Sequence, residues 1–200
     1  MAADIFRKQG QNILPYSKKM WTDLCKAYFV GGKWYHTGYT PTLQEYLDNA
    51  VATIAVPVIL HFTYVLVSNQ ITREGLEGFE QEYLNVIHCS ATLLRLADDL
   101  RTSTDEMKRG DVPKSMQCYM NETGASEGNA HEYIWHLIDV TWKKMIKDRL
   151  KTYSFPPTLI ETAMNLAKMA QFMYLYGDGH GSQDQVTRNR ILSLVVNPIS

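Results

Sequence analysis

The chain has 200 residues, of which 45% are hydrophobic and 20% charged, which is enough for one domain with a sizeable core. Lys and Arg number 20 against 21 Asp and Glu, and the formal net charge of -1 argues against a nucleic-acid partner and against an acidic disordered tail. The cysteines, Cys25, Cys89 and Cys118, are scattered and have no metal-ligand spacing, so we expect reduced thiols in an intracellular compartment.

The N-terminal stretch MAADIFRKQGQN has neither the apolar core of a signal peptide nor the composition of a transit peptide, so no targeting signal is predicted. Helical patterns recur along the chain, whereas strand patterns are nearly absent. A first helix is predicted over about Ala3–Tyr28, ending near VGGKWYHTGYT, because adjacent glycines favour a loop. Thr40 as the cap and Pro41 at the first helical position predict the start of the next helix, which runs towards Val67.

The segment Val51–Val67, VATIAVPVILHFTYVLV, is almost wholly apolar. It is at the short end for a membrane span and carries Pro57 and His61 near its middle, so a buried core helix is favoured over a transmembrane one. Pro57 removes a backbone hydrogen bond and predicts a kink or a break in that helix.

A third, long helix is predicted over roughly Phe79–Lys108, with Gly110 as its C-terminal cap and Pro113 beyond it. A helix capped by Ser126 is predicted to run through Lys151.

The pair Thr158 and Glu161 has the spacing of a capping box, for a helix that reaches Tyr176. The stretch GDGHGSQDQ then predicts a loop, followed by a short last helix near Val186–Val196. There are no internal repeats and no domain linker. The sequence therefore predicts an all-α fold, an antiparallel helical bundle.

A charge-rich stretch, LRLADDLRTSTDEMKRGD, lies within the third predicted helix and just after it. Asp98, Thr102 and Glu106 are spaced i, i+4 and i+8, so they share one side of the helix and extend over about 12 Å of its axis. Helical side chains lean towards the N-terminus, so Glu106 can reach back towards Thr102. Two carboxylates and a hydroxyl suit Mg²⁺ or Mn²⁺ rather than zinc, and Arg95 and Lys114 nearby would suit a phosphate. The alternative is that this stretch is the solvated face of a surface helix.

The residues DDLRTSTDE match the second metal-binding motif of class I terpene synthases. The surrounding LRLADDL and EMKRGDVPKSMQCYM resemble plant monoterpene synthases of the limonene type, and so do PTLQEYLDNA, MNLAKMAQFMYLYGDGHG and RILSLVVNPI. The resemblance extends over essentially the whole chain. It implies a partial class I terpenoid synthase fold.

The resemblance also implies roles for individual residues. The metal ligands for Mg²⁺, with Mn²⁺ as the alternative ion, would be Asp98, Thr102 and Glu106. The diphosphate-binding groups would be Arg95 and Lys114.

Tyr174 and His180 match residues near the mouth and wall of the family's active site. The break near Ala55–Pro57 would lie in the pocket wall. The implied substrate is a prenyl diphosphate, geranyl diphosphate in this subgroup. The implied location is the chloroplast, and the alternative, since no transit peptide is seen, is the cytoplasm.

One departure from the family is clear. The other metal motif, Asp-Asp-x-x-Asp, is absent, because the sole Asp-Asp is Asp98-Asp99 and Leu-Arg-Thr follows it. In the family that motif lies upstream, on the opposite wall of the pocket. Residues 1–200 are therefore interpreted as the C-terminal part of a terpene synthase catalytic domain, without the N-terminal α-domain and the helix of the Asp-rich motif.

Two hypotheses follow. In the first, the chain belongs to a lyase that ionises an allylic diphosphate with Mg²⁺ to form a monoterpene. In the second, it is an inactive truncated fragment or a degenerate paralogue that associates with other chains through exposed apolar faces, Val51–Val67 foremost. Neither hypothesis includes a nucleic-acid partner or a membrane span.

Overall fold

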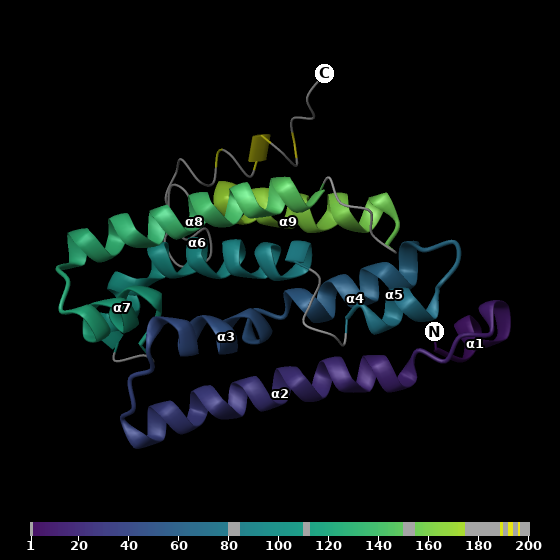
Figure 1. The fold of residues 1–200 in the computed structure, drawn as a ribbon, viewed down its shortest axis with the longest axis horizontal. Helices are drawn as coiled ribbons and strands as arrows, with labels where there is room; N and C mark the ends of the chain where they lie inside the picture. The colour runs from purple at the N-terminus through teal and green to yellow at the C-terminus, as the bar shows by residue number, and fades with distance from the viewer. Residues whose placement is uncertain are drawn as a thin grey trace.

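The computed structural model describes residues 2–79, 85–109, 113–149 and 155–174, together with residues 189, 192–193 and 196. Within these ranges all regular structure is α-helical, as predicted. The principal helices are α1 (Ala2–Gln9), α2 (Leu14–Thr37), α3 (Leu43–Thr53), α4 (Val56–Val67), α5 (Arg73–Glu77), α6 (Asn85–Arg109), α7 (Ser115–Thr123), α8 (Glu127–Arg149) and α9 (Pro157–Tyr174). Helices α3 and α4 lie end to end along α2, and α3 lies between α2 and α6 (Figure 1).

The single N-terminal helix predicted over Ala3–Tyr28 is wrong in two respects. The chain breaks between α1 and α2 at Gly10, whose φ of 70° is a left-handed conformation that glycine adopts without strain. At the other end α2 continues through Gly31 and Gly32, because a glycine costs a helix interior only about 1 kcal/mol and the packing of α2 on α3 and α4 offsets that cost. The helix ends instead at Gly38, with φ 67°.

The predicted start of the next helix at Thr40 and Pro41 is two residues too early. Helix α3 is capped by Thr42, whose hydroxyl accepts the Glu45 backbone N–H (3.2 Å) while the Glu45 carboxylate accepts the Thr42 N–H (2.8 Å). A reciprocal capping box needs Glu or Gln three residues after the cap. Glu45 has that position relative to Thr42, whereas Leu43 has it relative to Thr40.

The break predicted from Pro57 is confirmed. Helix α3 ends at Thr53, Ala55 has a φ of 61°, and Pro57 lies in the first turn of α4. Among the described residues, Leu43–Val67 is the one segment long and apolar enough to cross a membrane, but half of its most apolar window is buried inside the fold. This burial agrees with the predicted core helix, and only Ile59, Leu66 and Val67 of the apolar residues in α4 are exposed.

Helix α6 is the centre of the fold and contacts α3, α4, α7, α8 and α9. Several of its apolar side chains are fully buried, among them Ile87, Leu93 and Leu96. The hydroxyl of Ser90 is also buried and donates to the Ala163 carbonyl of α9 at 2.7 Å. The predicted third helix matches α6, although the prediction began at Phe79 and residues 80–84 are outside the described ranges.

The remaining helix predictions had mixed outcomes. Ser126 caps α8 as predicted, since its hydroxyl accepts the Asn129 N–H at 3.3 Å. The capping box at Thr158 is wrong, because α9 begins at Pro157 and Thr158 therefore lies within its first turn. The short helices α5 and α7 were not predicted. The predicted last helix, Val186–Val196, falls mostly outside the described residues.

An aromatic cluster, formed by His61, Tyr64, Phe79 and Phe155, fills the core beside α5. Its ring centroids lie 5.1–5.9 Å apart in tilted and edge-on pairs. The Tyr64 hydroxyl accepts the backbone N–H of Thr72 at 3.0 Å, and the residue packs against Gly75 so closely that a side chain there would overlap its ring. This cluster therefore depends on tight packing around a glycine.

Candidate functional site

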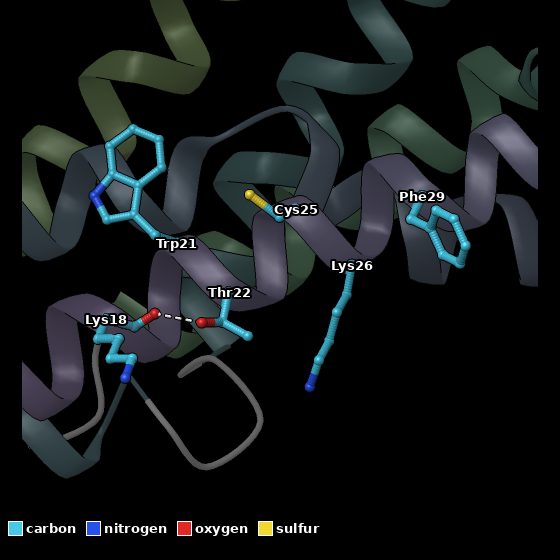
Figure 2. A pocket seen from close by; sticks show the side chains of 6 residues that line it. All are labelled: Lys18, Trp21, Thr22, Cys25, Lys26 and Phe29. Carbon is cyan, nitrogen blue, oxygen red and sulfur yellow. Dashed lines mark hydrogen bonds between the residues drawn. The ribbon is translucent and has the colours of Figure 1, made fainter.

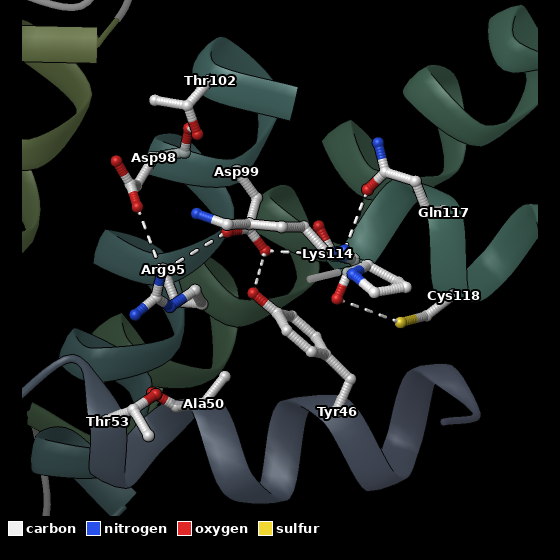
Figure 3. Close-up of polar contacts among 12 residues, drawn as sticks. Tyr46, Ala50, Thr53, Arg95, Asp98, Asp99, Thr102, Lys114, Gln117 and Cys118 are labelled. Atoms are coloured by element: carbon white, nitrogen blue, oxygen red, sulfur yellow. Dashed lines mark hydrogen bonds and ion pairs between the residues drawn. The ribbon is translucent and has the colours of Figure 1, made fainter. Parts of the chain in front are cut away.

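The predicted metal-binding face of α6 is partly solvent-accessible. Side chains of Arg95 and Asp98 are 12% and 16% exposed, and Arg95 Nη1 donates to Asp98 Oδ2 at 3.1 Å. The Thr102 hydroxyl donates to the Asp98 carbonyl at 3.0 Å, which is the bond expected between positions i and i+4 of a helix. These three side chains lie along one side of α6 (Figure 3).

This face supplies hard oxygen donors of the kind that Mg²⁺ prefers. A hydroxyl that donates its hydrogen keeps lone pairs on its oxygen, so Thr102 remains a possible ligand beside the Asp98 carboxylate. Glu106 belongs to the same helix, but its side chain lies outside the described part of the structure. The described residues contain no group of three His, Cys, Asp or Glu able to enclose an ion by themselves. The donor set thus fits an ion that also takes oxygens from water or from a substrate phosphate.

The neighbouring carboxylate, Asp99, points into the core and has no exposed surface. Its Oδ2 accepts the Tyr46 hydroxyl of α3 at 2.7 Å and the Ser115 backbone N–H of α7 at 3.3 Å (Figure 3). Its Oδ1 lies 3.6 Å from Arg95 Nη1. The Asp99 network, meaning Tyr46, Arg95, Asp98, Asp99 and Ser115, therefore joins three helices through one buried charge.

Burial and charge shape the ionisation of this network. Burial raises the pKa of Tyr46 well above its ordinary value, and the negative charge of Asp99 raises it further, so the hydroxyl stays a donor. Burial by itself lowers the pKa of Arg95, but the negative charges of Asp99 and Asp98 outweigh it, and the pKa is raised overall. Arg95 is therefore a permanent cation beside two carboxylates.

Lys114 directly precedes α7, next to the Asp99 network. Its backbone N–H donates to Gln117 Oε1 at 2.9 Å, and the following residue, Ser115, donates to Asp99. Arg95 Nη1 lies 3.6 Å from Asp99 Oδ1, and Lys114 directly precedes the residue whose N–H donates to Asp99, so the two predicted diphosphate-binding residues lie in the same region of the structure (Figure 3).

Sequence analysis missed Asp99, Tyr46 and Ser115. A signal was present, because Asp99 follows the fully buried Leu96 by three residues and so lies on the apolar side of α6. Its partner Tyr46 could not be found this way, since it is 53 residues distant in the sequence.

Of the two residues predicted near the mouth and wall of the active site, the structure describes only Tyr174, which is not brought to this face. Tyr174 lines a small cleft of about 30 Å³ with Ala97, Leu100, Trp135, Ile138 and Gln171. At about 100° per residue, Ala97 and Leu100 lie on the opposite side of α6 from Asp98 and Thr102. His180 lies outside the described residues.

A second hollow lies on the outer surface of α2, lined by Lys18, Trp21, Thr22, Cys25, Lys26 and Phe29 (Figure 2). It is separated from the α6 face by α3 (Figure 1). Its cysteine, Cys25, is exposed, whereas Cys89 and Cys118 are buried. Burial raises the pKa of Cys89 to about 11 and that of Cys118 to about 12. All three thiols are free, as the sequence predicted.

Comparison with known proteins connects this geometry to a family. Residues 1–144 match the family described as "Terpene synthase family, metal binding domain". The chain is 55% identical over 199 residues to a chloroplastic myrcene synthase of Quercus ilex, covering 100% of this chain and 33% of that protein. It is 53% identical over 199 residues to the (-)-alpha-terpineol synthase of Vitis vinifera, covering 100% of this chain and 34% of that protein.

Two solved structures match this chain over its whole length. An isoprene synthase from grey poplar, in complex with three Mg²⁺ ions and dimethylallyl-S-thiolodiphosphate, is 40% identical with a TM-score of 0.87, covering 100% of this chain and 38% of that chain. A limonene synthase with 2-fluorolinalyl diphosphate is 37% identical with a TM-score of 0.90, covering 100% of this chain and 37% of that one. The chain spans about a third of the length of the curated relatives it matches. Since the family match covers most of its residues and both structures follow it throughout, the chain belongs to the terpene synthase family.

Proposed function

We propose that this chain forms part of a monoterpene-forming lyase and contributes one wall of its Mg²⁺–diphosphate site. Geranyl diphosphate is the proposed substrate, since relatives include myrcene, terpineol and limonene synthases. The single observation that carries the proposal is the Arg95–Asp98 pair beside Thr102 on one partly exposed face of α6. The grey poplar isoprene synthase was solved with Mg²⁺ and a diphosphate analogue, which supports the same chemistry here.

The proposed roles follow from donor chemistry. Asp98, Thr102 and Glu106 would hold Mg²⁺, with Mn²⁺ as a possible substitute. Bound there, the ion would offset the negative charge that grows on the diphosphate as its bond to carbon breaks. Arg95 and Lys114 would donate to diphosphate oxygens, Arg95 through the forked guanidinium that matches phosphate geometry.

Further roles are proposed on the resemblance. Tyr174 and His180 would act at the mouth and wall of the pocket, and the break near Ala55–Pro57 would lie in that wall. The Quercus ilex relative is chloroplastic, and we extend the same location to this protein.

Calorimetric titration of inorganic pyrophosphate with Mg²⁺ tests the site. We expect weak binding by the unaltered chain and none by Asp98→Ala. The matched control is Asp139→Ala, since Asp139 is an exposed carboxylate on α8 that pairs with Lys143 at 2.6 Å, far along the chain from the site. Equal heats from the unaltered chain and Asp98→Ala would overturn the assignment.

Activity of the chain by itself is a separate proposal. The family holds its ions from two walls and residues 1–200 contain one metal motif, so we expect no measurable turnover of geranyl diphosphate at any Mg²⁺ or Mn²⁺ concentration. Loss of a single electrostatic contact typically costs about 100- to 1,000-fold in rate, and here several are lacking. Headspace gas chromatography decides this. Terpene above a boiled control, abolished by Asp98→Ala, would contradict it.

The second candidate function is association with other chains. Apolar residues of α1 and α2 are exposed, including Phe6, Leu14, Tyr28 and Phe29 at 60–65%. The segment first suspected, Val51–Val67, is partly buried, and only Ile59, Leu66 and Val67 among its large apolar residues are exposed, so the α2 surface is the stronger candidate. Light scattering should show oligomers, and a monomer at all concentrations would exclude this.

A further inference from the structure

The two adjacent aspartates of the motif have different surroundings. Asp98 is partly exposed and has Arg95 at 3.1 Å, whereas Asp99 has no exposed surface and receives hydrogen bonds from two other helices. Arg95 lies between them and is in ion-pair range of both. Only one of its two partners is therefore accessible to a ligand from solution.

The inaccessible partner is fixed in place. Tyr46 OH, at 2.7 Å, and Ser115 N–H, at 3.3 Å, both donate to Asp99 Oδ2. The other oxygen, Oδ1, accepts no hydrogen bond within the described ranges but lies 3.6 Å from Arg95 Nη1. A carboxylate held at one oxygen presents the other in a constant direction, here towards the guanidinium.

We propose that Tyr46 and Asp99 are positioning residues that hold Arg95 in place when Asp98 leaves its contact with Arg95 to bind a metal–diphosphate ligand. This inference rests on the proposed function. Asp98 would leave its contact with Arg95 when it binds a cation, and the guanidinium would otherwise lose its orientation. Because Asp99 is anchored from α3 and α7, Arg95 keeps one carboxylate partner and directs its remaining N–H groups to the diphosphate.

The test compares two buried tyrosines. Tyr46→Phe removes the donor to Asp99, whereas Tyr64→Phe removes a buried hydroxyl that bonds to Thr72 in the aromatic cluster. Mg²⁺–pyrophosphate affinity is measured by titration calorimetry, and thermal denaturation confirms that each protein is folded. We expect Tyr46→Phe to weaken binding about 10-fold, as removal of a supporting partner of a ligand typically does, and Tyr64→Phe to leave it unchanged.

A purely structural role for Tyr46 would not depend on the side chain at position 95. An Arg95→Lys background keeps the positive charge but loses the forked guanidinium. In that background, Tyr46→Phe should weaken Mg²⁺–pyrophosphate binding less than about 3-fold. If that background binds too weakly to measure, the contrast between the two tyrosine variants decides. Asp99→Asn provides a second route should Tyr46→Phe not fold, and it should weaken binding at least as much.

The outcomes separate the two proposals. Binding that is lost in Asp98→Ala but unchanged in Tyr46→Phe overturns the positioning role and leaves the proposed function intact. Equal losses in Tyr46→Phe and Tyr64→Phe also overturn it. No binding by the unaltered chain overturns the proposed function, and this inference with it.

Discussion

Tyr46 and Tyr64 are both buried, 8% and 1% exposed, and both use their hydroxyl, yet they belong to regions that are stabilised differently. Tyr46 donates to a carboxylate in the Asp99 network, where charges meet near the surface of α6. Tyr64 accepts a backbone N–H in the aromatic cluster, where rings pack around a glycine. The first region depends on matched charge, and the second on filled volume. A different kind of substitution should therefore destabilise each region.

The largest expected effect is removal of the buried charge. Asp99→Ala leaves Arg95 with one carboxylate and leaves the Tyr46 hydroxyl and Ser115 N–H without their acceptor. We expect the free energy of unfolding to fall by about 3–5 kcal/mol in urea denaturation. Asp98→Ala is the control. Because Asp98 is nearer to solvent, this substitution should lower the free energy of unfolding by less than about 1 kcal/mol. Similar losses from both would show that burial does not distinguish the two aspartates.

The aromatic cluster should instead be sensitive to added volume. A Cβ at Gly75 would lie 2.6 Å from Tyr64 Cζ, so Gly75→Ala should destabilise by about 2–3 kcal/mol in the same assay, and Mg²⁺–pyrophosphate binding should not change. Gly128→Ala in α8 is matched, because a Cβ there meets nothing within 4 Å. If Gly75→Ala is no worse than Gly128→Ala, the cluster is looser than described.

The cluster also contains a titrating group. His61 is fully buried, with Nε2 2.9 Å from Ser17 Oγ, and burial lowers its pKa to about 4. The unfolded chain takes up this proton at its ordinary pKa of about 6.5, before the folded chain does. The stability contributed by neutral His61 should therefore fall by about 3 kcal/mol as the pH drops from about 6.5 to 4, and His61 should contribute no further change below that range. Denaturation curves at several pH values check this. The free energy of unfolding should fall less steeply with decreasing pH in His61→Gln. An equal slope in both proteins would mean that groups other than His61 cause the fall.

The smallest expected effect measures the coupling within each region. Tyr46→Phe and Tyr64→Phe should each cost about 1 kcal/mol, the usual value of a hydrogen bond. Combined with Asp99→Asn in a double-mutant cycle, Tyr46→Phe should show a coupling of about 1 kcal/mol, whereas Tyr64→Phe should be additive within about 0.5 kcal/mol. A coupling for Tyr64 as large as that for Tyr46 would mean that the two regions are not independent.

Local patterns in the sequence predicted much of the fold. Apolar periodicity indicated the helices, Pro57 indicated the break before α4, and Ser126 indicated the start of α8. Predictions failed where a local preference competed with packing or with a better local alternative. Gly31 and Gly32 favour a loop, but the packing of α2 carries the helix past them, and Thr42 caps α3 because Glu45 completes its box.

The candidate site divides in the same way. That Asp98 and Thr102 share a face of α6 follows from the helical repeat, which depends only on residues a turn apart. Their metal-binding role, and that of Glu106, stays a prediction. That Asp99 is buried against Tyr46 and Ser115, with Arg95 between two carboxylates, was decided by the packing of α3 and α7 on α6. A helix repeat specifies which side chains share a face, but the partner of a buried charge is chosen by whichever distant element packs against that face.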